Sequence, residues 1–530
     1  MMIRSNNPIM PGFYPDPSIC AVGEDYYLVN SSFAYFPGLP IMHSKDLVHF
    51  EQIGNVLDRA SQLPLPKAGV SRGLFAPTIR YHQGIFYVIC TNVSFGGNFV
   101  VTAENPEGPW SEPHYLEGAD GIDPSLFFDH DGKCYYIGTH PNPNGCAYDG
   151  DWYIYIQELD TDNWKMVGEQ HNVWNGAMKG VHWPEGPHLY KIGEYYYIIH
   201  AEGGTGPEHA VSVVRSRMIF GPYENHFCNP ILTHRHLGAQ YPIKYVGHAD
   251  LIETPAGEWY MTMLAVRPRE CFTTMGRETF LAKVTWENDW PVVNAGVGIL
   301  TDVVDVNLTE WVPEEDVTSY TSRTHAKTCI PGSSRNYDFA FMKELGDEFM
   351  TLREPLNDRV KLIPGEGLEL KFGMDALTSD GAPSYVCIRQ QHHTFTVNAT
   401  LQTQGIRDYG VAGLVLFQNE GYHLKVEFDG KKVALILCED GKDNVLGDID
   451  VAGESVKLCL SVKDLCAKAY IRDAEGRKDI LATADVRNLS TEVAGGFVGC
   501  TTGIYAVGNP KKSVIFTGLG YLAEEFAHRS

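Results

Sequence analysis

The sequence contains no apolar stretch long enough to cross a membrane, and its first residues, MMIRSNNPIMPG, have no apolar core of the kind that a signal peptide requires. It also has no CxxC pair, because its twelve cysteines are scattered singly between Cys20 and Cys500. This scatter argues against a zinc site or a redox motif. We therefore expect a cytoplasmic protein with reduced, mostly buried thiols.

Positive charge is scarce in this chain. There are 42 Lys and Arg against 66 Asp and Glu, a formal net charge of −24, and no long basic run. Phosphate backbones and anionic lipids are both held by clustered Lys and Arg. We therefore expect neither a nucleic acid nor a membrane as a partner, and a neutral or small ligand instead. The sequence does not determine the oligomeric state, and a homo-oligomer is compatible with it.

Length and repeats indicate the architecture. The 530 residues are too many for one ordinary core, and 44% of them are hydrophobic. Five segments share a residue pair, an apolar strand start, a turn with Gly or Asp, and an aromatic-rich strand. They are DPSICAVGEDYYLVNSS from Asp16, APTIRYHQGIFYVICTNVS from Ala76, DPSLFFDHDGKCYYIGT from Asp123, GPHLYKIGEYYYIIHAEGG from Gly186 and HADLIETPAGEWYMTMLAV from His248.

The starts of these repeats lie about 47 to 63 residues apart, the range in which four-stranded propeller blades repeat. Alternating apolar residues, tight turns and paired aromatics make each copy a hairpin, and no segment of this part has a sustained helical period. The pattern predicts an all-β fold whose residues 1–315 form a five-bladed β-propeller. An unrelated β-sandwich is the alternative.

A propeller places equivalent residues of its blades around one axis, so the residues that open the repeats should face one another across a central cavity. They are Asp16, Ala76, Asp123, the pair Glu185-Gly186, and His248. Asp16 lies between two prolines, and the ring of the second favours an extended backbone that would aim its carboxylate. Three acids at these positions would destabilise a repeat that had only a structural role, because unpaired buried charge is strongly unfavourable.

Converging carboxylates are what glycosidic bond hydrolysis requires. One must be protonated to release the leaving oxygen, and another must be ionised to activate water or attack the anomeric carbon. A third raises the pKa of the acid by like-charge repulsion. The apolar face of a sugar packs on aromatic rings, for which Phe33, Phe75 and Trp183 are candidates; taken singly, each is more typical of a core residue.

The sequence resembles glycoside hydrolase family 43, the family of β-xylosidases and α-L-arabinofuranosidases. The matching segments are NPIMPGFYPDPS, SRGLFAPTIRY, GIDPSLFFDHDG, WPEGPHLYKIGEYYY, AEGGTGPEH, GHADLIETPAGEW and GRETFLAKVTWENDWP. The resemblance implies that Asp16 is the general base, that Glu185 is the general acid, and that Asp123 tunes the acid and orients substrate. It implies inversion, in which water held by Asp16 attacks the anomeric carbon in one displacement.

Further roles follow from the same resemblance. Arg277 would bind sugar hydroxyls in the innermost subsite and act with Asp123 on the charge state of the acid. Phe33, Thr205 and His248 would line the pocket, and in some relatives the equivalent of His248 coordinates a calcium ion on the propeller axis. No organic cofactor is expected.

Some residues leave alternatives open. Phe75 stands where relatives commonly have tryptophan, which puts the preference among pentoses in doubt. For His248, a hydrogen-bonded axial histidine is the alternative to a metal ligand. A salt bridge at a strand end is favoured over a sugar contact for Arg267. Two further readings are a fructan or sucrose hydrolase, whose Asn-Asp-Pro-Asn-Gly motif is absent, and a sugar-binding propeller without catalysis.

The propeller pattern stops after residue 315. Residues 316–336 are polar and are predicted to be a linker, and alternating segments over 337–530 predict a β-sandwich, as in the xylosidase branch of the family. In that branch a sandwich loop closes one side of the pocket. The candidate is GGFVGCTTGIYAVGNP, with Phe497 and Tyr505 as the aromatics that could reach in.

A closed pocket and a cytoplasmic location favour short imported substrates. We expect an inverting, exo-acting β-1,4-xylosidase that releases xylose from the non-reducing end of xylo-oligosaccharides, with α-L-arabinofuranosidase activity on arabinosyl-substituted oligosaccharides as a side activity or as the main one.

Overall fold

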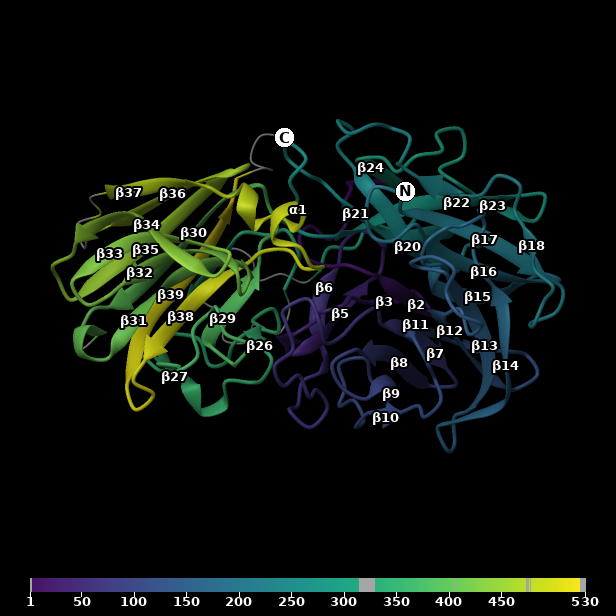
Figure 1. The fold of residues 1–530 in the computed structure, drawn as a ribbon, viewed down its shortest axis with the longest axis horizontal. Coiled ribbons are helices and arrows are strands. Elements are labelled where there is room, and N and C mark those ends of the chain that lie inside the picture. Colours follow the sequence, from purple (N-terminus) through teal and green to yellow (C-terminus); the bar gives the residue numbers. More distant parts are fainter. Residues whose placement is uncertain (1, 314–328, 405, 473–475, 477, 525–530) are drawn as a thin grey trace.

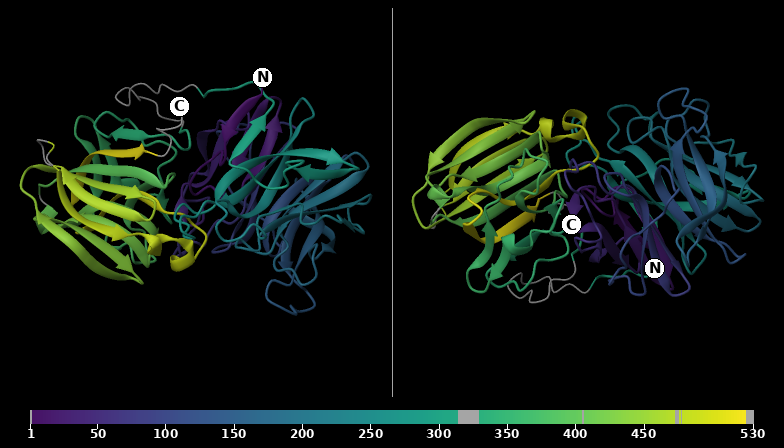
Figure 2. Two further views of the ribbon diagram at one scale, coloured as in Figure 1. Left: turned by 90° about the horizontal axis from the view of Figure 1, so that it is seen from above. Right: turned by 60° about the horizontal axis from the view of Figure 1, so that its bottom comes forward.

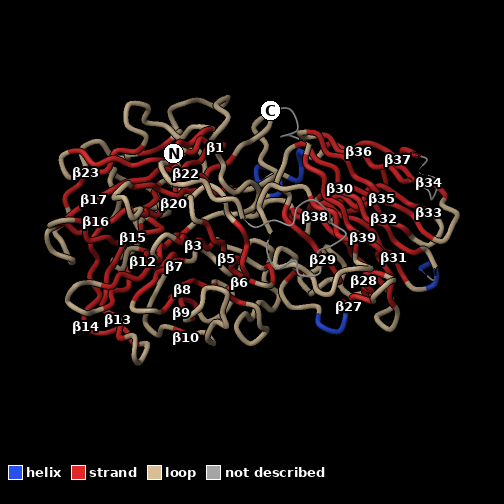
Figure 3. The backbone as a smooth tube through the Cα atoms, turned by 180° about the vertical axis from the view of Figure 1, so that it is seen from behind, coloured by secondary structure: helices blue, strands red, loops and turns tan. Residues whose placement is uncertain are grey.

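The computed structural model describes residues 2–313, 329–404, 406–472, 476 and 478–524. The fold is all-β, as predicted, and strands dominate the view in Figure 3. The described helical elements are short: α1 (Thr491–Ala494) and the 3-10 turns η1 (Asn357–Arg359), η2 (Ile406–Asp408) and η3 (Arg487–Leu489). No helix among the described residues is long and apolar enough to span a membrane. All twelve cysteines are free, and eight are buried.

The N-terminal part forms five antiparallel sheets, purple to teal in Figure 1. The first contains β2 (Ser18–Val22), β3 (Asp25–Val29), β5 (Gly38–Ser44) and β6 (Glu51–Leu57), and the second β7 (Thr78–His82), β8 (Ile85–Asn92), β9 (Gly97–Ala103) and β10 (His114–Tyr115). The third contains β11 (Ile122–Phe128), β12 (Cys134–Pro141), β13 (Trp152–Asp160) and β14 (Lys165–Trp174).

The fourth sheet contains β15 (Glu185–Ile192), β16 (Tyr195–Glu202) and β17 (Ala210–Ser216), which pairs with both β18 (Glu224–Asn225) and β19 (Leu232–Thr233). The fifth contains β20 (Lys244–Glu253), β21 (Trp259–Val266), β22 (Glu278–Glu287) and β23 (Trp290–Val293). The first two strands of each sheet are the hairpin predicted from the repeats. Outside these sheets, β1 (Ile3–Asn6) pairs with β24 (Val303–Val306).

These five sheets form a closed ring. Their first strands contact one another in the order β2, β7, β11, β15 and β20, and β20 contacts β2 again. Buried apolar side chains fill the wedge between each pair of neighbouring sheets, which gives five separate clusters. Because burial of a single Leu, Ile or Phe side chain stabilises by about 1.5–3 kcal/mol, these wedges hold the sheets at fixed angles around the centre.

The C-terminal part is a β-sandwich, green to yellow in Figure 1. One sheet contains β27 (Val360–Ile363), β28 (Gly367–Lys371), β39 (Ser513–Ala523), β30 (Thr394–Gln402), β35 (Ser455–Lys463), β36 (Cys466–Arg472) and β37 (Lys478–Asp485), with β25 (Arg335–Asp338) paired to β39. The other contains β29 (Ser384–Arg389), β38 (Thr501–Gly508), β31 (Gly410–Asn419), β32 (Tyr422–Phe428), β33 (Lys432–Glu439) and β34 (Lys442–Asp450). The largest apolar cluster of the described residues lies between them.

Most of the predicted linker at 316–336 lies outside the described residues. The strand β25 begins at Arg335, so regular structure of the C-terminal part resumes within the last residues of that predicted linker.

The two halves lie side by side in every view and share an interface (Figure 2). The strand β26 (Thr351–Leu352) of the C-terminal half pairs with β4 (Tyr35–Phe36) of the N-terminal half. An apolar cluster that includes Phe13, Val498 and Tyr505 spans both halves. The loop between α1 and β38 therefore reaches the ring from a firmly packed base.

Candidate active site

Four of the five sheets share an unusual backbone where their first strands meet the centre of the ring. Asp16, Asp123 and His248 have φ values of 52°, 53° and 50°, in the left-handed region that favours glycine, and Gly186 has 56°. The extended backbone predicted at Asp16 is therefore wrong. The ring of Pro17 disfavours the right-handed helical region, but the left-handed region remains open to aspartate.

Irregular pairing accompanies this backbone. The ladders of β11, β15 and β20 each have a register shift beside these residues, which redirects side chains from the sheet toward the ring centre. Gly186 is required here, because a Cβ atom at this position would lie 2.7 Å from the His248 ring. Strained or irregular backbone of this kind is common where a functional side chain must be aimed.

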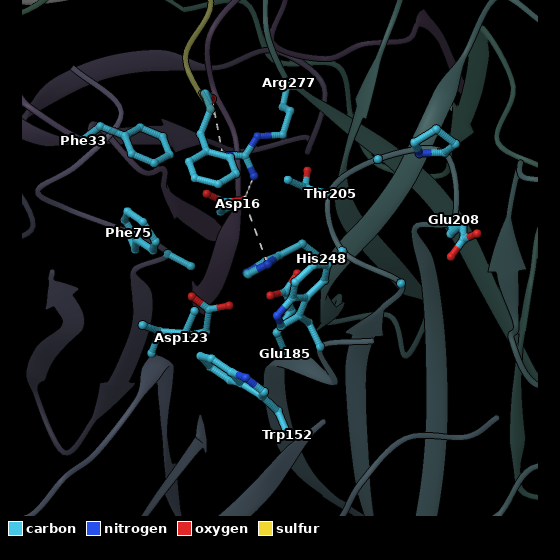
Figure 4. A pocket seen from close by; sticks show the side chains of 18 residues that line it. Asp16, Phe33, Phe75, Asp123, Trp152, Glu185, Thr205, Glu208, His248 and Arg277 are labelled. Carbon is cyan, nitrogen blue, oxygen red and sulfur yellow. Dashed lines mark hydrogen bonds and ion pairs between the residues drawn. The ribbon is translucent and has the colours of Figure 1, made fainter. Parts of the chain in front are cut away.

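A cavity of about 670 Å³ lies at the centre of the ring (Figure 4). All five predicted repeat openers line it, and the three carboxylates Asp16, Asp123 and Glu185 come together there although they are far apart in sequence. The other predicted site residues also line this cavity, namely Phe33, Phe75, Trp183, Thr205, Arg277 and Phe497.

Asp16 is the carboxylate that is held ionised. Arg277 Nη1 donates a hydrogen bond to its Oδ1 at 2.6 Å, and Ser31 Oγ donates to its Oδ2 at 2.6 Å. Burial alone would raise the pKa of Asp16. Burial is outweighed by the charges of Arg277 and His248 and by the Ser31 hydrogen bond, so the pKa lies below its usual value. Asp16 is therefore an acceptor for a proton at neutral pH.

Glu185 and Asp123 have the opposite tendency. Burial raises the pKa of Glu185 well above its usual value, and the negative charges of Asp123 and Asp16 raise it further. Burial also raises the pKa of Asp123, to about 6, with a further contribution from Asp16. The cavity thus holds one ionised carboxylate facing one carboxyl group that keeps its proton, which is the arrangement needed for acid–base chemistry on a single bound molecule.

Polar donors and aromatic rings surround the acids. The Thr205 hydroxyl and the Arg277 Nε are buried without a hydrogen-bond partner among the described residues, so both are available to a ligand. Phe33 stacks on Phe497, with ring centroids 6.1 Å apart, and Phe75 meets Phe497 edge-on at 5.9 Å. Such a mixture of hydroxyl-binding groups and flat apolar rings suits a sugar.

Residues 5–291 match the model of glycosyl hydrolases family 43, and residues 336–516 match the beta xylosidase C-terminal concanavalin A-like domain. The chain belongs to glycosyl hydrolase family 43. It is a glycoside hydrolase, as the three carboxylates indicate.

Relatives of this family 43 enzyme match it along nearly its whole length. A xylosidase/arabinosidase of Butyrivibrio fibrisolvens is 48% identical and covers 99% of this chain and 100% of its own. A non-reducing end alpha-L-arabinofuranosidase of Bacteroides ovatus is 37% identical and covers 95% of this chain and 91% of its own. The crystal structure of a xylan beta-1,4-xylosidase from Bacillus halodurans has a TM-score of 0.87 at 33% identity, covering 98% of this chain and 99% of its own.

The C-terminal half of this family 43 enzyme contributes one wall of the cavity, as predicted for Phe497. The backbone N–H of Phe497 donates to Ser71 Oγ at 2.9 Å, and its carbonyl accepts from Arg277 at 3.4 Å. Tyr505, the other predicted aromatic, does not reach the cavity. It lies on β38 inside the interface cluster, where its hydroxyl donates to Glu427 at 2.6 Å.

Trp152 and Glu208 line the cavity but were not predicted from the sequence. Trp152 begins the third strand of its sheet, and Glu208 lies in the loop after β16. Neither position belongs to the repeated hairpin. A tryptophan that follows a glycine-containing loop, as Trp152 does, is nevertheless a signal by which a sugar-binding residue could have been proposed. The structure also shows the salt bridge favoured for Arg267, whose Nε donates to Glu278 Oε2 at 2.8 Å.

Proposed function

We propose that this family 43 enzyme is an inverting, exo-acting β-1,4-xylosidase that releases xylose from the non-reducing end of xylo-oligosaccharides. The observation that carries the proposal is the opposed charge state of two carboxylates in one cavity. Asp16 is held ionised by Arg277, and burial and like charge keep Glu185 protonated.

In the proposed reaction Asp16 acts as the general base and Glu185 as the general acid. Asp16 takes a proton from a water molecule while the water oxygen bonds to the anomeric carbon. The bond from that carbon to the leaving oxygen breaks, and Glu185 donates its proton to this oxygen. Asp123 does not transfer a proton; its charge raises the pKa of Glu185, and its carboxylate orients the sugar.

The shape of the cavity supports exo action. Five sheets meet around it, and the Phe497 loop from the sandwich closes over one side. The ring of sheets is, in this proposal, a five-bladed propeller with one sugar subsite at its centre. A chain end fits such a site, whereas the middle of a polysaccharide needs an open groove.

An arabinofuranosidase is the second candidate. The Bacteroides ovatus relative carries that activity in its name, and the Butyrivibrio fibrisolvens relative names both sugars. β-D-Xylopyranose and α-L-arabinofuranose present similar hydroxyls to one site. We infer short, soluble oligosaccharides as substrates, met in the cytoplasm.

Initial rates on nitrophenyl β-xyloside and nitrophenyl α-L-arabinofuranoside test the sugar preference. Under the proposal kcat/KM is higher for the xyloside, and the reverse order makes the enzyme mainly an arabinofuranosidase. Proton NMR in the first minutes of xyloside hydrolysis should show α-xylose appearing before β-xylose. β-Xylose first would refute inversion, and no turnover of either glycoside would leave a sugar-binding propeller.

A further inference from the structure

One guanidinium ties all five sheets together just behind the cavity. Arg80, on β7 of the second sheet, donates from Nη1 to Asp250 Oδ2 at 2.8 Å and to Ser18 Oγ at 3.3 Å. From Nη2 it donates to His188 Nδ1 at 2.9 Å and to Ser125 Oγ at 3.4 Å. These four partners come from the other four sheets, so each sheet supplies one residue to the cluster.

The cluster is in register with the catalytic carboxylates. Ser18 and Ser125 follow Asp16 and Asp123 by two positions, His188 follows Gly186 by two, and Asp250 follows His248 by two. Each residue that contacts Arg80 thus lies only two positions beyond the residue that opens its repeat at the cavity. A displacement of Arg80 would therefore also move the strand ends that carry the catalytic carboxylates.

Asp250 has no oxygen left for another cation. Oδ1 accepts from the Tyr190 hydroxyl at 2.5 Å and from Arg80 at 3.2 Å. Oδ2 accepts from Ser18 Oγ at 2.6 Å and from the Ile19 backbone N–H at 3.0 Å, in addition to Arg80. Its side chain is fully buried. The Arg80 charge compensates the Asp250 carboxylate, which would otherwise be a costly buried charge.

His188 has no free nitrogen lone pair with which to coordinate a cation. Its Nδ1 accepts a hydrogen bond from Arg80, which has only donors, so the proton of the neutral ring is on Nε2. Burial lowers the pKa of His188 to about 3, which keeps the ring neutral. A nitrogen that carries a proton cannot coordinate a metal ion.

The residues around His248 also do not fit the calcium ion that some relatives hold. Calcium takes six to eight oxygen ligands. The His248 Nδ1 lies 3.9 Å from Asp16 Oδ1, but that oxygen already accepts from Arg277 and the other accepts from Ser31. Among the described residues, the His, Cys, Asp and Glu groups that converge closely enough to share a metal ion are His423, Cys438 and Asp443, in the sandwich.

We propose that Arg80 is a positioning residue that serves as the fixed cation of the ring centre, so that this enzyme needs no divalent cation. Its guanidinium contacts one residue from each of the other four sheets and so fixes the strand ends carrying Asp16, Asp123 and Glu185. The inference rests on the proposed function for its rate measurements, but not for its binding measurements.

The first experiment uses the unmodified enzyme. After dialysis against a chelator, calorimetric titration with Ca²⁺ should show no binding, and addition of Ca²⁺, Mg²⁺ or Mn²⁺ should change kcat by less than about twofold. The melting temperature should not change with Ca²⁺. Stoichiometric Ca²⁺ binding, or loss of activity on chelation that the metal restores, would overturn the proposal. Because calorimetry needs no turnover, it gives an answer even if the proposed function fails.

The second experiment changes the guanidinium. We expect Arg80→Ala to lower kcat on nitrophenyl β-xyloside by about 10²-fold with KM within about threefold, because misplaced carboxylates weaken the chemical step. Free guanidinium ion should raise the kcat of Arg80→Ala at least about fivefold. The matched control is Arg59→Ala, which removes a partly exposed arginine bound to Glu112 and should show neither the loss nor the rescue.

Arg80→Lys covers the case in which Arg80→Ala does not fold. It keeps the charge but cannot make the forked contacts, so its kcat should fall about tenfold while its circular dichroism spectrum stays unchanged. A folded Arg80→Lys or Arg80→Ala protein with the kcat of the unmodified enzyme would refute the positioning role. So would a low kcat of Arg80→Ala that Ca²⁺ restores and guanidinium does not.

Discussion

Removal of the Arg277 guanidinium should move the whole pH profile of kcat/KM upward. The Arg277–Asp16 contact is short, at 2.6 Å, and the two side chains are 11% and 6% exposed. A charge-assisted hydrogen bond of this kind contributes about 1.5–3 kcal/mol. Since 1.36 kcal/mol corresponds to one pKa unit, Arg277→Met should raise the pKa of Asp16 by about 1–2 units.

The direction of each limb follows from the charges. Asp16 must be ionised, so raising its pKa moves the acidic limb to higher pH, and below that limb the rate falls about tenfold per pH unit. Arg277 also opposes the rise in the pKa of Glu185, so its loss should move the alkaline limb to higher pH as well. Nitrophenyl β-xyloside is the substrate, assayed from pH 4 to 9.

The control is Arg267→Lys, since Arg267 pairs with Glu278. Its acidic limb should stay in place. If Arg277→Met lowered kcat/KM equally at every pH, the arginine would only bind sugar, and the assignment of Asp16 as a base whose pKa it depresses would be refuted.

Other predictions concern single side chains. Glu185→Ala should lower kcat/KM far more on xylobiose than on the nitrophenyl xyloside, whose leaving group needs no proton, whereas Asp16→Asn should lower both by about 10²- to 10⁴-fold; equal losses for Glu185→Ala would remove it from the acid role. Asp123→Asn should move the alkaline limb to lower pH, because burial and the Asp123 charge together raise the pKa of Glu185; an unmoved limb contradicts this. Phe497→Ala should raise KM several-fold in steady-state assays, and an unchanged KM would exclude Phe497 from the subsite. Phe417→Ala, in the fully buried interface cluster, should destabilise by about 3–5 kcal/mol in urea unfolding; a loss below about 1 kcal/mol would show that the interface contributes little.

The repeat carried most of the information that the sequence offered. An alternating hairpin copied five times predicts both the sheets and the fact that Asp16, Asp123 and His248 occupy equivalent places, because a ring repeats its geometry as the chain repeats its pattern. The three carboxylates could therefore be placed in one cavity without any contact information.

Features outside the repeat could not be obtained this way. Whether Phe497 enters the cavity depends on how the sandwich docks on the ring, and a local sequence pattern does not determine this. For the same reason Tyr505 was wrongly predicted to enter the cavity. Trp152 lies on a third strand, where no repeat marks it. Arg80 lies in the repeat that opens with Ala76, which offers no polar side chain to mark the position. Only the assembled ring shows that its guanidinium contacts the four other sheets.

The long sequence separation of the partners around Asp16 has a consequence during synthesis. Asp16 leaves the ribosome early, but the arginine that gives it a counter-charge is 261 residues away, and the loop bearing Phe497 follows 220 residues later still. In a nascent chain that ends before Arg277, burial of the Asp16 carboxylate would lack its counter-charge, which makes closure of the ring unfavourable before the fifth sheet has been synthesised. The growing polypeptide is thus without hydrolytic activity until almost all of it has been translated.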